Sequence, residues 1–151
     1  MEIRLTATAL IERDSRYLLV EEIAQGRIVL NNPSGRWHEG ESFAEAAIRE
    51  AAEEAGVLFV PEFFLGSYIT LHTALGGLSI CTVRFAYCGR IVPGVPDTPR
   101  DPAILGTHWL TFEEVLAQKA RLRSSAVLRS ISDYRSRKMC PVNTVSVMRD
   151  S

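Results

Sequence analysis

The chain has 151 residues, of which 46% are hydrophobic and 23% charged, and its formal net charge is −1. This balance is typical of a globular domain, and folding can bury roughly two-thirds of the surface of an unfolded chain of this length. A near-neutral chain lacks the overall basic charge with which many nucleic-acid-binding proteins attract phosphates. We therefore expect one domain over residues 1–151 that does not bind nucleic acid.

The cysteines and the first residues of the chain indicate the cellular compartment of the protein. Cys81, Cys88 and Cys140 form no C-x-x-C pair and have no histidine at metal-ligand spacing, so they predict neither a disulfide framework nor a zinc site. Free thiols fit a reducing cytoplasm. The chain starts without a basic segment followed by an apolar one, and no stretch approaches the roughly 18 apolar residues that span a bilayer. We expect a cytoplasmic protein without a membrane partner.

Short strands dominate the first part of the chain. Leu5–Ile11 and Tyr17–Glu21 are rich in apolar and β-branched residues and flank a turn at Asp14–Arg16, which predicts a hairpin. Ile28–Leu30 predicts a further short strand. Asn31–Gly35 predicts a loop, because Asn, Pro, Ser and Gly interrupt regular structure.

A helix follows this loop. Ser42 and Glu45 have the spacing of a capping box, Phe43–Ala55 contains neither Gly nor Pro, and Gly56 provides a C-terminal stop. At 3.6 residues per turn, one face of this helix is expected to hold an apolar set: Ala44, Ala47, Ile48, Ala51 and Ala55.

The rest of the chain predicts more strands and two helices. Phe63–Thr73 and Leu78–Val92 read as long antiparallel strands, and Pro93–Pro102 reads as a loop because it has four prolines in ten residues. We then expect, in order, a strand, a short helix opened by a capping box and an amphipathic helix: Leu105–Leu110, Thr111–Lys119 and Ser124–Arg137. The predicted fold class is α/β (α+β) around a mixed sheet.

Three carboxylates share about one turn of the predicted helix over Phe43–Ala55. Glu50, Glu53 and Glu54 stand at spacings that cost roughly a few tenths of a kcal/mol per like-charged pair, in a last turn where the helix dipole disfavours anions. A hard divalent cation such as Mg²⁺ takes oxygen ligands and reverses this repulsion. The alternative is a solvated acidic face.

Two neighbouring features favour the metal interpretation. Arg49 is four residues from both Glu45 and Glu53, so it can pair with either and orient a carboxylate. Gly35 lies in a loop where a backbone carbonyl can turn inward as a further oxygen ligand.

Read together, these residues reproduce the pattern G-x5-E-x7-R-E-U-x-E-E-x-G-U, where U is aliphatic, over residues 35–57. The segment resembles a Nudix box, and the order of elements on both sides is similar to the Nudix fold, an α/β/α sandwich around a mixed sheet. The members of the motif are Gly35, Glu41, Arg49, Glu50, Glu53, Glu54, Gly56 and Val57.

The resemblance implies hydrolysis of a phosphoanhydride in a nucleoside or other organic diphosphate. It implies Mg²⁺, with Mn²⁺ as an alternative, held by Gly35, Glu50, Glu53 and Glu54. Glu53 or Glu50 is the candidate to take the proton of the attacking water, and Arg49 completes the catalytic set.

A finer resemblance is to NudJ-type phosphatases, through Leu19–Glu22, Asn32–Gly35 and Leu122–Ser124, with Val127, Ser130, Ile131 and Tyr134. It implies nucleoside tri- and diphosphates and hydroxymethylpyrimidine pyrophosphate as substrates, bound by a monomer or a homodimer. The alternatives are an ADP-ribose or dinucleoside polyphosphate pyrophosphatase and a non-catalytic Nudix-fold module that binds a nucleotide.

Other candidates lie outside the box. Arg27, Arg36 and Arg84 are candidate substrate-binding residues, because guanidinium groups match phosphate bidentately, although each is equally an ordinary surface arginine. The box has His38 where many members of the family have a carboxylate. Asp101 and Asp97 on the proline-rich loop are candidates for a further acidic group, and solvated loop residues are the alternative.

Overall fold

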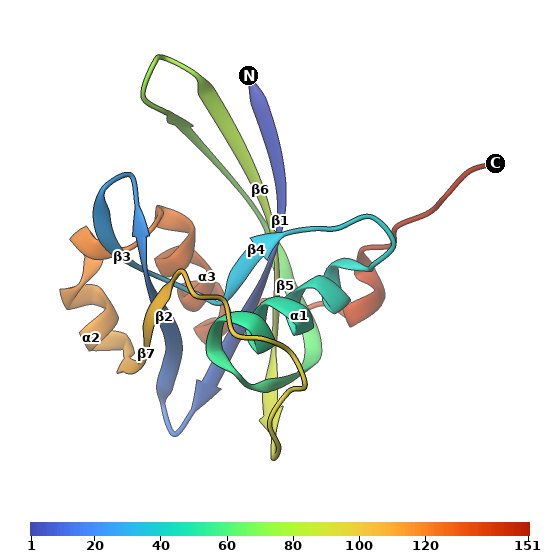
Figure 1. Cartoon of the computed structure of the whole chain (residues 1–151). Helices are drawn as coiled ribbons and strands as arrows, with labels where there is room; N and C mark the ends of the chain where they lie inside the picture. Colours follow the sequence, from blue (N-terminus) through green and yellow to red (C-terminus); the bar gives the residue numbers. More distant parts are fainter.

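Seven strands form one mixed sheet, and helices cover both of its faces in the computed structural model of residues 1–151 (Figure 1). The strands are β1 (Glu2–Arg13), β2 (Arg16–Ala24), β3 (Arg27–Asn31), β4 (Ser34–Arg36), β5 (Leu58–Thr73), β6 (Ser79–Val92) and β7 (Ile104–Thr111). The α-helices are α1 (Phe43–Ala55), α2 (Phe112–Ala117) and α3 (Ser125–Arg135), and Lys119–Arg121 and Val142–Thr144 form 3-10 turns. The predicted mixed α+β class is confirmed.

The long strand β1 organises the sheet. The strand order is β3-β2-β1-β6-β5, with β4 paired to β1 and β7 paired to β2. The β1–β6 pairing is parallel and the others are antiparallel. Because β1 pairs with β6, β4 and β2 along its length, it connects the β5–β6 hairpin to the half of the molecule that holds β2, β3 and β7.

Alternation along β1 separates two hydrophobic clusters. Ala7, Ala9 and Ile11 pack in a cluster with the alanines of α1, whereas Leu10 packs in a second cluster with Val127 of α3. Successive residues of a strand point to opposite faces, so α1 and α3 cover opposite faces of the sheet.

Helix α1 begins and ends where its capping residues predict. Both hydrogen bonds of the Ser42–Glu45 capping box form, and Gly56 ends the helix in the left-handed conformation at φ 66°. The predicted apolar face is partly wrong, because Ile48 is 37% exposed while the carboxylate-bearing residues Glu50 and Glu54 are buried. The acidic flank of α1 packs against β4, so burial extends from the alanine face to these glutamates.

Two local predictions also need correction. The predicted loop Asn31–Gly35 contains the start of strand β4, which pairs Ser34 with Thr8 of β1. Strand β5 begins before the predicted Phe63 and includes Pro61. A register shift between Pro61 and Phe63 on this outer strand accommodates the proline, which has no N–H to donate.

The β5–β6 hairpin and the start of β1 project from the body of the molecule (Figure 1). Register places Arg4 and Thr6 of β1 beside Thr82 and Arg84 of β6, so these side chains share one face of the projecting sheet. None of the helices combines the length and apolar character that a bilayer crossing requires.

Candidate functional site

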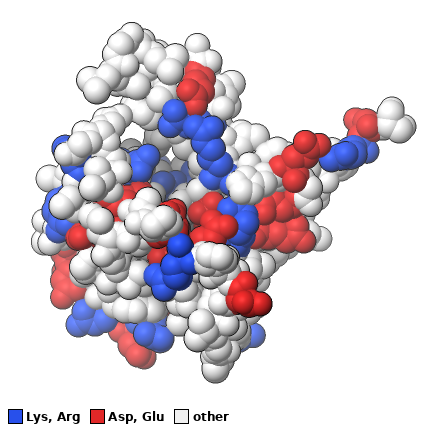
Figure 2. Space-filling model, viewed as in Figure 1, with Lys and Arg blue, Asp and Glu red and all other residues white.

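A cleft of about 940 Å³ is bordered by α1, strands β3 and β4, the projecting sheet and the N-terminus of α3. Acidic and basic side chains gather together around this hollow (Figure 2). The structure brings most of the candidate residues to it: Gly35, Arg49, Glu50, Glu53, Glu54, Arg27, Arg36, Arg84 and Asp101. Asp97 does not line it.

Strand β4 places Gly35 against the acidic flank of α1. Gly35 pairs with Ala7 of β1, and a β-carbon built on Gly35 would overlap the carboxylate of Glu50. The bare α-carbon therefore leaves the space that the Glu50 side chain occupies.

Glu54 is held on the same strand. Its Oε1 atom accepts a hydrogen bond of 2.7 Å from the backbone N–H of Ser34, and the residue is 4% exposed. Burial raises the pKa of Glu54 to about 8, and the nearby negative charges of Glu22, Glu50 and Asp101 act in the same direction. A cation in the cleft would stabilise the ionised form of this carboxylate.

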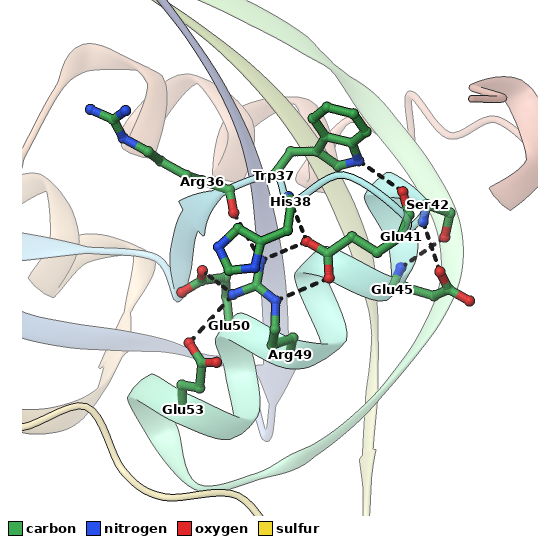
Figure 3. A network of polar contacts seen from close by, with 9 residues as sticks. All are labelled: Arg36, Trp37, His38, Glu41, Ser42, Glu45, Arg49, Glu50 and Glu53. Atoms are coloured by element: carbon green, nitrogen blue, oxygen red, sulfur yellow. Dashed lines mark hydrogen bonds and ion pairs between the residues drawn. The ribbon is translucent and has the colours of Figure 1, made fainter. Parts of the chain in front are cut away.

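Arg49 connects α1 to the loop that precedes it (Figure 3). Its Nε and Nη2 atoms donate to the two oxygens of Glu41 at 3.0 and 2.7 Å, and Nη2 also donates to the carbonyl of Arg36 at 2.8 Å. Its Nη1 atom donates to Glu50 at 2.6 Å and to Glu53 at 3.4 Å. One guanidinium thus orients three carboxylates.

The partner of Arg49 across one helical turn is Glu53 and not Glu45. Glu45 instead accepts a hydrogen bond of 2.7 Å from the backbone N–H of Ser42 in the capping box. Burial raises the pKa of Glu50 despite its contact with Arg49. Glu41 has the opposite shift, because its hydrogen bonds from Arg49 and from the N–H of His38 outweigh burial and lower its pKa.

The proline-rich loop packs on the C-terminal end of α1. The backbone N–H of Asp101 donates to the carbonyl of Glu53 at 2.8 Å, and Arg100 Nη2 donates to the carbonyl of Glu54 at 3.1 Å. The carboxylate-bearing residue Asp101 thereby reaches the cleft beside Glu54, although it follows that glutamate by more than forty positions in the printed sequence.

The three candidate arginines differ in burial. Arg27 and Arg36 are exposed at the edge of the cleft, whereas Arg84 is 6% exposed. Sequence reasoning did not single out Glu22 or Arg123, which form an ion pair of 2.8 Å in the lining of the cleft. The only sequence signal for Glu22 and Arg123 is that both stand in segments that resemble NudJ-type phosphatases.

The donor chemistry of the cleft fits Mg²⁺, whose ligands are carboxylate and carbonyl oxygens. No three Asp, Glu, His or Cys side chains converge as a ready-made metal site in this structure, and Glu50 and Glu53 both contact Arg49. The fit therefore rests on the type of ligand and on the negative charges of Glu22, Glu50 and Asp101 near the buried Glu54 carboxylate. Burial and these charges both raise the pKa of Glu54.

Comparison with known proteins adds independent findings. The model of the NUDIX domain family matches residues 2–131. Phosphatase NudJ of Escherichia coli strain K12 is 30% identical over 140 residues, which cover 93% of this chain and 88% of the phosphatase. The NudJ phosphatase of Shigella flexneri matches to the same extent.

Solved structures share the fold. A NUDIX hydrolase from Nitrosomonas europaea is 36% identical, with a TM-score of 0.85 over 97% of this chain and 98% of that protein. The NUDIX domain of NrtR from Shewanella oneidensis, solved with ADP ribose, is 18% identical, with a TM-score of 0.68 over 91% of this chain and 88% of that chain. The chain belongs to the NUDIX domain family and is a phosphoanhydride hydrolase of the Nudix type.

Proposed function

We propose that this chain is a Mg²⁺-dependent phosphatase or pyrophosphatase that hydrolyses nucleoside tri- and diphosphates and hydroxymethylpyrimidine pyrophosphate, with Mn²⁺ as an alternative metal. The observation that carries this proposal is the gathering of Gly35, Glu50, Glu53 and Glu54 at one cleft that also contains arginines. The similarity to phosphatases named NudJ supports the substrate class.

In this proposal the carbonyl of Gly35 and the carboxylates of Glu50, Glu53 and Glu54 hold the metal. Bound Mg²⁺ would neutralise the diphosphate and lower the pKa of the attacking water. Glu53, which is less buried than Glu50 and Glu54, or Glu50 itself accepts the proton of that water. Arg49 orients the carboxylates, and Arg27 and Arg36 contact the phosphates from the edge of the cleft.

We also propose that residues 1–151 act as one domain in the cytoplasm, as a monomer or a homodimer. The three thiols, all unpaired in the structure, support a reducing compartment. The substrate is a small molecule in this proposal, because the charged cleft is closed on several sides by the projecting sheet, α1 and α3.

The decisive experiment is a substrate panel with and without Mg²⁺. It contains nucleoside di- and triphosphates, hydroxymethylpyrimidine pyrophosphate, ADP-ribose and dinucleoside polyphosphates, and released phosphate and pyrophosphate are measured separately. We expect Mg²⁺-dependent release from the nucleotides or the pyrimidine. Cleavage confined to ADP-ribose or dinucleotides would contradict the proposed substrates, and tight binding without turnover would indicate a binding module.

The matched variant is Glu53→Gln, which keeps the shape of a partly exposed side chain and removes its charge. We expect kcat to fall by about 100-fold or more, because removal of a general base or metal ligand costs this much. The control is Glu113→Gln on α2, which is exposed and does not line the cleft. Wild-type turnover by Glu53→Gln would overturn the assignment of the metal site.

A further inference from the structure

Arg84 is a buried cation without a direct ion-pair partner. It projects from strand β6, which lies between β1 and β5, into the lining of the cleft, and the residue is only 6% exposed. Its Nη1 and Nη2 atoms donate to the side-chain oxygens of Asn32 and Asn31 at 3.3 and 3.0 Å. These amides are neutral and no carboxylate forms a direct ion pair with Arg84. The amides therefore orient its charge, and Glu22 and Glu54 attract it only from a greater distance.

One hydrogen-bond donor beside Arg84 lacks an acceptor. The Nδ2 atom of Asn32 is buried without any hydrogen-bond partner. The Oε1 atom of Glu22 accepts from both Arg123 at 2.8 Å and the amide of Asn31 at 3.3 Å. A buried cation whose hydrogen-bond partners are neutral amides is costly, so an anion bound at the cleft side of Arg84 would stabilise it.

Helix α3 adds to the positive character of this end of the cleft. The lining includes Arg123 together with Ser124 and Ser125, which are the N-cap and first residue of this 11-residue helix. The N–H groups of a first helical turn and the helix dipole favour an anion at this position. Two guanidinium groups and a helix N-terminus therefore meet at this end of the cleft, with the carboxylates of Glu22 and Glu54 nearby.

We propose that Arg84, together with Arg123 and the N-terminus of α3, forms a subsite for a phosphoryl group that is not the one attacked. This inference rests on the proposed function, because it divides the cleft into a glutamate end for the reacting phosphorus and an arginine end for its neighbour. The planar guanidinium of Arg84 matches two phosphate oxygens, and its position on strand β6 keeps it oriented before the substrate arrives.

This division has a consequence for specificity. A diphosphate or triphosphate occupies both ends of the cleft, whereas a phosphate monoester occupies only one. Arg84 therefore selects compounds with at least two adjacent phosphoryl groups, independently of the organic group attached to them.

The first test measures binding without metal, so that it does not depend on turnover. Inorganic pyrophosphate is titrated calorimetrically into the full chain in EDTA, for wild type, Arg84→Gln and Arg123→Gln. We expect affinity to fall by about tenfold or more in Arg84→Gln and by a smaller factor in Arg123→Gln. The control Arg90→Gln, whose side chain is exposed near Glu62 and outside the cleft, is expected to bind as wild type does.

Arg84→Lys guards against a variant that fails to fold, because it keeps the charge and loses the fork of donors. We expect it to bind pyrophosphate more weakly than wild type and more tightly than Arg84→Gln. Glu53→Gln is expected to keep metal-free pyrophosphate binding even though its turnover falls, which separates this proposal from the proposed function. Wild-type affinity in both Arg84 variants and in Arg123→Gln would overturn the subsite.

Kinetics then assign the source of the phosphoryl group. If it belongs to the substrate, KM of the best diphosphate rises by about tenfold in Arg84→Gln while kcat changes much less, because the contact is made before the reaction. If the site holds released phosphate, the product-inhibition constant rises instead. Unchanged values of KM and of the inhibition constant would contradict the proposal.

Discussion

The carboxylate of Glu50 lies against the α-carbon of Gly35, in space that the β-carbon of any other residue would occupy. The pairing of β4 with β1 fixes the position of Gly35, and the alanine face of α1 fixes that of Glu50. A glycine is therefore required here by the available space and not by an unusual backbone angle, since Gly35 is not among the residues with positive φ.

The first prediction follows from this contact. Gly35→Ala is expected to displace the Glu50 side chain and to lower kcat/KM by about 100-fold. Misplacing a metal ligand, or a group that orients one, has effects of this size. The free energy of unfolding should change by only about 1 kcal/mol, because the obstructing group is the far end of a flexible side chain.

The control for this prediction is Gly106→Ala on β7. A β-carbon on Gly106 would meet no atom within 4 Å, so activity and stability should remain near the wild-type values. Steady-state kinetics and urea denaturation of both variants provide the comparison. Equal activity of the two variants would show that the position of Glu50 does not matter for turnover.

The second prediction concerns the fork of Arg49. Arg49→Lys keeps the positive charge but cannot donate in parallel to both oxygens of Glu41 while also contacting Glu50. We expect kcat/KM to fall by about tenfold in Arg49→Lys and by up to about 100-fold in Arg49→Gln. The matched control is Arg129→Lys on α3, which is 65% exposed and lies outside the cleft. Wild-type kinetics in Arg49→Gln would show that this network is only structural.

The third prediction compares two aspartates of the proline-rich loop. Asp101 lines the cleft beside Glu54, and Asp97 does not. Asp101→Asn is expected to weaken the apparent affinity for Mg²⁺ in turnover, raising the concentration for half-maximal activity by about tenfold, since one negative charge near the cation is lost. Asp97→Asn should titrate with Mg²⁺ as wild type does. Identical Mg²⁺ titrations of the two variants would remove Asp101 from the site.

The fourth prediction concerns stability in acid. Asp133 on α3 accepts hydrogen bonds from Tyr68 Oη at 2.9 Å and from Arg129 Nε at 3.1 Å. Burial alone would raise the pKa of Asp133, but these contacts outweigh it and hold the pKa below its ordinary value of 3.8. The ionised group therefore stabilises the fold above that pH, and this contribution disappears as the pH falls through the lowered pKa.

Asp133→Asn should accordingly destabilise the protein by about 1–3 kcal/mol at neutral pH and by progressively less as the pH falls through the lowered pKa of Asp133. Urea denaturation at several pH values measures the difference, and Asp150→Asn in the exposed C-terminal segment is the matched control. A deficit that does not diminish in acid would show that the loss comes from packing and not from the carboxylate.

Local signals predicted much of the framework. The Ser42–Glu45 capping box and Gly56 set the ends of α1, because both capping interactions involve residues within one turn of the helix. Strand β4 was not expected, since three residues carry no periodicity and its pairing partner in β1 lies about thirty positions earlier in the sequence.

The surroundings of the candidate residues were less accessible to sequence reasoning. A helical repeat shows that Glu50, Glu53 and Glu54 are neighbours, but not that β4 buries the first and last of them. The sequence indicates Arg84 as a candidate only through its guanidinium group. Its burial against Asn31 and Asn32 depends on the pairing of strands β6, β1, β2 and β3, which no single segment encodes.

Arg100 and Asp101 contact the last carbonyls of α1. The electrostatic environment of Glu53 and Glu54 therefore depends on the proline-rich loop, which is distant in sequence. The final turn of α1 has no basic residue of its own, and the Arg100 guanidinium and the Asp101 N–H satisfy its carbonyls instead. An insertion or deletion between Pro93 and Pro102 would uncover these carbonyls and change the local field at Glu53 and Glu54. In the proposed function, loop length would thus adjust the affinity for the metal from a distance, while the motif of residues 35–57 stays intact.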